Sequence, residues 1–138
     1  MIWIPHGICD TAGMRGKMDK QQSKEMAKLA IGALADKKAE DIRIVDISEI
    51  SVMADYFIIA NGNNRSQIQA LSDNVQEILE KAGCRMRQVE GYHTANWILL
   101  DFGDLIIHIF DKENRQFYNL EHIWRDGKQL SPEDFTDQ

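Results

Sequence analysis

The chain has 138 residues, which is enough for one domain with a hydrophobic core and too few for two ordinary domains. Its composition, 43% hydrophobic and 28% charged, is typical of a globular protein, and no apolar stretch approaches the roughly 20 residues that span a bilayer. The formal net charge of -6 argues against a broad basic face that grips phosphate backbones. We therefore expect no membrane and no sequence-specific nucleic acid among its partners.

The first 17 residues, MIWIPHGICDTAGMRGK, differ in character from the rest of the chain. Their short apolar opening is broken by Pro5, so it is neither a signal peptide nor a membrane anchor. We expect residues 1–17 to be a disordered leader from a tag or an upstream start, with the domain beginning at Met18. Cys9 and Cys84 have no metal-ligand spacing and no secretory signal accompanies them, which indicates a reduced, cytoplasmic protein.

Three elements are expected in the first half of the domain. Apolar residues recur at helical spacing over residues 23–38, which predicts a first helix. Apolar and charged residues alternate over 42–47, which predicts a strand. The run YFIIA at 56–60 is apolar without alternation, as is typical of a strand in the interior of a sheet.

The second helix has the clearest pattern. Six apolar residues fall on one face: Ile68, Leu71, Val75, Ile78, Leu79 and Ala82. Ser66 and Gln69 have capping-box spacing at its start, and Gly83 stands just past its end. Gly62 ahead of this helix could cradle a phosphate, but a single glycine favours a turn followed by a cap.

Three more strands are predicted after this helix, over 84–90, 97–101 and 105–110. Only three residues separate the last two strands, so they must form an antiparallel hairpin. The strands on either side of the second helix can be parallel, joined by a right-handed βαβ unit. The fold class is therefore α/β: a single domain over 18–126 with a mixed parallel/antiparallel five-stranded sheet flanked by helices. Helical spacing predicts a terminal helix, before a flexible acidic tail at 127–138; its apolar residues are Phe117, Leu120, Ile123 and Trp124.

Several carboxylates invite a metal-dependent interpretation. Asp101, Asp104 and Asp111 could be the ligands of a two-metal phosphoryl-transfer site. However, Asp101 and Asp104 flank a tight turn, where Asp is favoured for hydrogen bonds to the local backbone, and no Gly-Ser phosphate loop precedes them. A nucleotidyltransferase or phosphohydrolase that uses Asp101, Asp104 and His108 remains the enzymatic alternative.

The histidines and cysteines give no stronger catalytic signal. His108 lies in the middle of a strand, where a lone imidazole is typical of a hydrogen-bonded core or interface residue. His93 falls in a polar loop and His122 on a helix face, so a metal site would need a convergence that the sequence does not indicate. Cys84 is most simply a small buried hydrophobe. We expect no catalytic residue, no cofactor and no metal.

The aromatic residues of the second half are interleaved with acids. Phe110 and Phe117 are predicted to be core residues, whereas the others resemble a hot-spot surface for a protein partner that carries Lys or Arg. The predicted partner-binding residues are Trp97, Tyr92, Asp101, Asp104, Tyr118 and Glu121.

A family pattern coincides with these residues. The matching positions are Val89-Glu90-Gly91, Trp97-Ile98, Asp101, Gly103-Asp104, His108, Arg115, Tyr118, Leu120-Glu121 and Trp124, together with Asp46, Asp55, Gly62 and Gln67. With them, the chain from Met18 to Trp124 resembles the ribosomal silencing factor family, RsfS, also called Iojap-like. The order Arg65-Ser66 departs from the family, which places Arg just before Gln67, and Ile123 replaces the usual Leu. The leader has no counterpart there.

The resemblance implies a non-enzymatic translation factor. Such proteins bind the large ribosomal subunit through ribosomal protein L-fourteen and sterically block its association with the small subunit under nutrient limitation. The resemblance also implies a nucleotidyltransferase-like fold without the catalytic motif, and a homodimer when the protein is free. A generic dimeric scaffold, which would not associate with ribosomes, is a third possibility.

Overall fold

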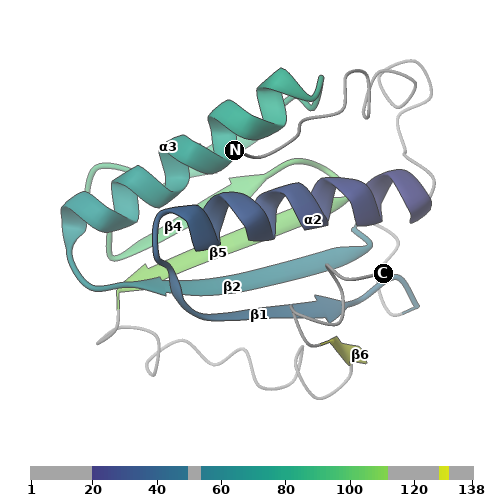
Figure 1. The fold of residues 1–138 in the computed structure, drawn as a ribbon, viewed down its shortest axis with the longest axis horizontal. Coiled ribbons are helices and arrows are strands. Elements are labelled where there is room, and N and C mark those ends of the chain that lie inside the picture. The colour runs from purple at the N-terminus through teal and green to yellow at the C-terminus, as the bar shows by residue number, and fades with distance from the viewer. Residues whose placement is uncertain (1–19, 50–53, 112–127, 131–138) are drawn as a thin grey trace.

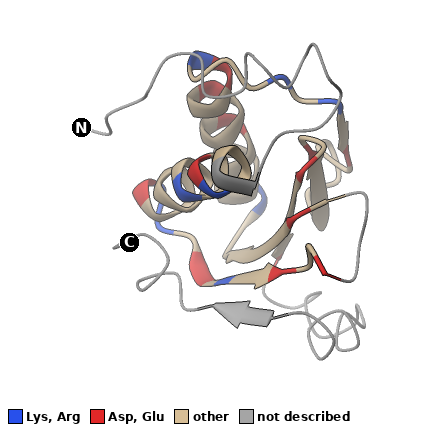
Figure 2. Cartoon of the chain, turned by 90° about the vertical axis from the view of Figure 1, so that its right-hand side faces the viewer, with Lys and Arg blue, Asp and Glu red and all other residues tan. Residues whose placement is uncertain are grey.

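The computed structural model describes residues 20–49, 54–111 and 128–130. Its elements in chain order are α2 (Lys20–Asp36), β1 (Glu40–Asp46), β2 (Tyr56–Gly62), α3 (Arg65–Lys81), β3 (Gln88–Glu90), β4 (Trp97–Asp101), β5 (Leu105–Asp111) and β6 (Lys128–Leu130). The strands form one mixed sheet in the order β3-β4-β5-β2-β1-β6. Both helices lie on one face of this sheet (Figures 1 and 2). Neither α2 nor α3 is long and apolar enough to cross a bilayer.

The centre of the sheet is a parallel pair. Strands β2 and β5 run side by side from the pair Tyr56 and Leu105 to the pair Gly62 and Asp111. All seven residues of β2 are buried, which confirms the prediction of an interior strand. The other strand pairs are antiparallel. The predicted α/β class and mixed sheet are confirmed, and β6 adds a short sixth strand to the five expected.

The predicted hairpin is also confirmed. Strands β4 and β5 pair antiparallel, with Trp97 opposite Phe110 and Asp101 opposite Ile106. The Asp101 Oδ1 atom accepts a hydrogen bond of 2.8 Å from the backbone N–H of Gly103. Asp101 therefore performs the local backbone role that is typical of Asp in a tight turn.

The strands on either side of α3, β2 and β3, run in the same direction in one sheet, as predicted, but they are not neighbours in it. The strand after α3, β3, covers only Gln88–Glu90 rather than 84–90, and it pairs with β4 at the edge of the sheet. Its three residues are all exposed, whereas the apolar β5 is mostly buried. A short polar strand tolerates an edge, and a long apolar strand gains more from the centre, so β5 takes the place beside β2.

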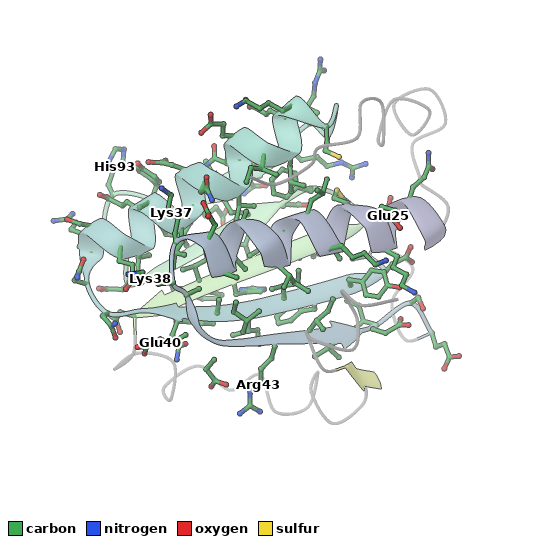
Figure 3. The ribbon with its side chains drawn as sticks, viewed as in Figure 1. Glu25, Lys37, Lys38, Glu40, Arg43 and His93 are labelled. Atoms are coloured by element: carbon green, nitrogen blue, oxygen red, sulfur yellow. The ribbon has the colours of Figure 1, made fainter. Side chains whose placement is uncertain are left out.

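The start of α3 lies two residues earlier than the predicted capping box. Asn64 is the N-cap, and its side chain accepts a hydrogen bond of 2.8 Å from the backbone N–H of Gln67. Gln67 Oε1 in turn accepts from the Asn63 N–H at 2.6 Å. The Gln67 amide also donates to the carbonyls of Lys37 and Lys38, at 3.2 and 3.0 Å. Lys37 and Lys38 lie just past the end of α2 (Figure 3). Gln67 thus ties the start of one helix to the end of the other.

The core has two parts, one on each face of the sheet. The larger part lies between the sheet and the helices and includes Ile58, Leu71 and Leu100. The smaller part lies on the opposite face. It contains the buried residues Val45, Ile47, Ala54, Phe57, Ile59 and Phe110, with Trp97 and Ile106 packed against them.

Several predictions fall wholly or partly outside the described residues. These are the leader at 1–17, the terminal helix at 117–124 and most of the tail at 127–138. Within the tail, Lys128–Leu130 forms β6 and pairs with β1.

Gly83 comes directly after the C-cap Ala82, as predicted. Cys84 is buried, as expected.

Candidate functional site

Trp97 opens β4 on the sheet face opposite the helices, where it is half-buried. Its indole Nε1–H donates a hydrogen bond of 2.8 Å to His108 Nδ1 on β5. The indole also stacks on the Phe110 ring, with centroids 5.5 Å apart and planes 19° apart. The ring of Phe57, on the neighbouring strand β2, lies 4.3 Å from the His108 imidazole, measured between ring centroids. We call Trp97, His108, Phe110 and Phe57 the aromatic cluster.

The strand register explains this cluster. Successive side chains of a strand point to opposite faces, so His108 and Phe110 share one face of β5. Because Trp97 pairs with Phe110 across the hairpin, its indole also reaches His108, one pleat away. Phe57 belongs to the same face of β2. The cluster is therefore built from side chains on three adjacent strands.

His108 is only 5% exposed, and this burial lowers its pKa from 6.5 to about 4. The ring is therefore neutral at neutral pH. A neutral imidazole has one donor and one acceptor nitrogen, and Nδ1 accepts from Trp97, so the proton sits on Nε2. The prediction that His108 is a hydrogen-bonded core or interface residue is confirmed.

This lowered pKa predicts a pH-dependent stability. Between pH 6.5 and about 4 the unfolded chain binds a proton at His108 that the folded chain does not, so acidification favours unfolding. The free energy of unfolding should fall by about 3 kcal/mol as the pH is lowered through this window. Below the window His108 is protonated in both states, so it causes no further loss of stability. Urea denaturation of the wild type and of His108→Leu at several pH values measures the difference. The prediction would be contradicted if the free energies of unfolding of the two proteins changed with pH in the same way.

Tyr92 lies apart from the aromatic cluster. The loop after β3 is held against α3, because Gln69 Nε2 donates to the Tyr92 carbonyl at 2.9 Å and Arg65 donates to the carbonyl of His93. The Tyr92 hydroxyl donates to Asp73 Oδ2 at 3.1 Å, and this hydrogen bond raises the tyrosine pKa above 10.0. The Tyr92 ring packs against the helix-side core. Figure 3 shows His93 at the end of the domain where α3 begins.

The predicted acids are also divided. Asp101 is half-buried on β4, on the same face as Trp97. Asp104 is buried at 6% exposure, and its carbonyl accepts from the N–H groups of Asp55 and Tyr56, at 2.8 and 3.2 Å. Tyr118 and Glu121 lie outside the described residues. Of the six predicted residues, the structure places Trp97 and Asp101 on one face and Tyr92 on the other.

A pocket of about 320 Å³ opens at the carboxyl ends of the two parallel strands, a usual place for ligands in α/β sheets. It is lined by Asn63, Asn64, Arg65, Thr94, Ala95, Asn96 and Asp111. Asp101 and Asp104 lie at the opposite end of β5, about 20 Å away by strand length. In the part of the chain that the structure describes, no three His, Cys, Asp or Glu side chains are grouped to hold a metal ion. Asp101, Asp104 and His108 are therefore not part of this pocket, whereas Asp111, the third carboxylate of the two-metal interpretation, lines it.

Sequence reasoning did not group His108 or Phe57 with Trp97. The signal for His108 was available in the register, because a hairpin with a three-residue connection fixes which residues oppose each other. Phe57 could not be found this way, since its place depends on the pairing of β2 with β5, which the sequence did not predict.

Comparison with known proteins shows to which family this chain is similar. The family model described as "Ribosomal silencing factor during starvation" matches residues 20–138. The protein named "Ribosomal silencing factor RsfS" of Bacillus subtilis is 41% identical over 104 residues, which cover 75% of this chain and 88% of that protein. Its namesake in Halalkalibacterium halodurans is 38% identical over 105 residues, covering 76% and 90%.

Solved structures agree with these matches. A crystal structure from Bacillus halodurans has a TM-score of 0.70 and 35% identity, covering 78% of this chain and 98% of that one. A structure from Chromobacterium violaceum has a TM-score of 0.72 and 35% identity, covering 83% and 92%. The match thus extends over sequence and fold together, and the chain belongs to the ribosomal silencing factor family, RsfS, whose relatives include the Iojap proteins.

Proposed function

We propose that this protein represses translation by binding the large ribosomal subunit through ribosomal protein L-fourteen and blocking association with the small subunit. The observation that carries the proposal is the match of the silencing-factor family model to residues 20–138, a match whose description names starvation. We place the activity in the cytoplasm under nutrient limitation. The free protein is proposed to be a homodimer.

The proposed mechanism is steric occlusion. A bound domain occupies the surface that the small subunit needs, so affinity and position decide the effect and no covalent bond is made or broken. This proposal requires no catalytic residue. It is supported by the distance between the candidate carboxylates Asp101 and Asp104 and the pocket beyond β2 and β5.

Trp97 is the proposed apolar anchor of the contact, with Asp101 beside it on the same face. A half-buried indole that is already packed on one side loses little conformational freedom when a partner covers the other side. Tyr118 and Glu121 remain proposed contacts, whereas Asp104, at 6% exposure, offers little surface to a partner. Tyr92 can contribute only if the partner also reaches around the β3 edge of the sheet, because its ring lies on the helix side.

Sedimentation with purified ribosomal subunits tests the proposal. Tagged protein should sediment with the large subunit and not with the small subunit, and adding it before mixing should reduce the fraction of joined ribosomes. Its association rate should fall with salt, as expected where acids face basic residues. No sedimentation with either subunit would reject the proposal. A stoichiometric magnesium, manganese or zinc site found by calorimetry would favour the enzymatic alternative.

A further inference from the structure

The hydrogen bond between Trp97 and His108 joins a half-buried residue to a buried one. His108 is 5% exposed and is surrounded by aromatic rings. The imidazole contacts the Phe57 ring at 4.3 Å, the Trp97 ring at 5.6 Å and the Phe110 ring at 6.1 Å, between ring centroids. His108 Nδ1 is therefore a fixed hydrogen-bond acceptor for the indole Nε1–H of Trp97.

We propose that His108 is a positioning residue for partner binding, which holds the Trp97 indole in one orientation by accepting its Nε1–H at Nδ1. This inference rests on the proposed function, because it assigns His108 a role in the same docking surface. His108 itself is buried and would not contact the partner. The partner is a protein surface with an apolar recess for the indole, flanked by Lys or Arg opposite Asp101.

Two features of the site support this role. Stacking on Phe110 fixes the plane of the indole but does not by itself fix its rotation within that plane, since stacking is not strongly directional. The hydrogen bond of 2.8 Å adds a direction that stacking lacks, because only one edge of the indole carries a donor.

The acceptor is also available throughout the neutral pH range. Burial keeps the imidazole neutral, so Nδ1 does not become a donor that would repel the indole N–H. A leucine at this position would fill the space and remove the acceptor. An asparagine would offer its Oδ1 near the position of Nδ1.

The test compares these two variants for binding to the purified large subunit. His108→Leu should weaken binding about tenfold, the value of one hydrogen bond that restrains a central anchor. His108→Asn should recover most of this loss. In a Trp97→Phe background, which lacks the donor, the two variants should bind equally.

Nuclear magnetic resonance supplies a readout independent of ribosomes. The indole N–H resonance of Trp97, assigned by its absence from Trp97→Phe, should shift in His108→Leu and stay close to the wild-type position in His108→Asn. Urea denaturation shows that each variant is folded before binding is compared.

The outcomes separate the two proposals. Failure of the wild type to bind the large subunit rejects the proposed function, and the positioning role in binding with it. Wild-type binding together with undiminished binding by folded His108→Leu rejects the positioning role alone. Equal weakening by His108→Leu and His108→Asn also rejects it, because a general packing defect would affect both.

Discussion

Replacing Trp97 by Ala is expected to weaken binding to the large ribosomal subunit by about 30-fold or more. Truncating a central Trp of a protein interface typically costs about 2 kcal/mol or more, and each 1.4 kcal/mol is a factor of ten in affinity. Trp97 fits this role because its indole packs on Phe110 and His108 and the residue is only half-buried. Co-sedimentation over a range of subunit concentrations measures the change.

The same substitution also affects the fold, so the comparison needs controls. Removing the indole leaves the buried Nδ1 of His108 without its donor and opens space beside Phe110, which together cost a few kcal/mol of stability. Urea denaturation must therefore show that Trp97→Ala is folded under the binding conditions. Trp97→Phe keeps an aromatic ring on Phe110 and should lose less affinity. Wild-type binding by a folded Trp97→Ala protein would remove Trp97 from the contact surface.

Replacing Tyr92 by Phe is a matched control on the opposite face of the sheet. It removes one hydroxyl, which bonds Asp73 in α3, and leaves the ring in the helix-side core. Reduced binding by this variant would mean that the partner reaches around the β3 edge. Unchanged binding would confine the partner to the face that carries Trp97.

Local patterns predicted most of the fold. The continuous apolar run of β2, the periodicity of α3 and the short connection between β4 and β5 each carry their own structural signal, because periodicity and loop length act within a few residues. The pairing of β2 with β5 was missed since it joins segments more than 40 residues apart. Strands of similar apolar character compete for a central position, and only the whole sheet decides between them.

The candidate site was predicted less completely for the same reason. Trp97 and Asp101 could be placed on one face from their spacing within β4. Whether Tyr92 joins them depends on the path of the loop, which its contacts with Gln69 and Asp73 direct toward α3. These contacts join residues that are far apart in sequence, so composition and spacing gave no indication of them.

Replacing Gly91 by Ala is expected to reduce the free energy of unfolding by about 3 kcal/mol or more. Gly91 has φ +79°, where a side chain is strained, and a Cβ atom there would lie 2.1 Å from the carbonyl oxygen of Trp97. That oxygen belongs to the backbone of β4, so relief of the clash must move the strand that carries the indole. The variant should therefore lose binding as well as stability.

Gly103→Ala is the matched control for this effect. Gly103 also has a positive φ, +88°, but the nearest atoms to its added Cβ belong to the guanidinium of Arg87, at 3.1 Å, which is the end of a flexible side chain. Gly103→Ala should therefore cost only the backbone strain, about 1–2 kcal/mol. Urea denaturation of both variants isolates the cost of the clash with β4. Equal losses would show that the approach of Gly91 to Trp97 is not what requires glycine at this position.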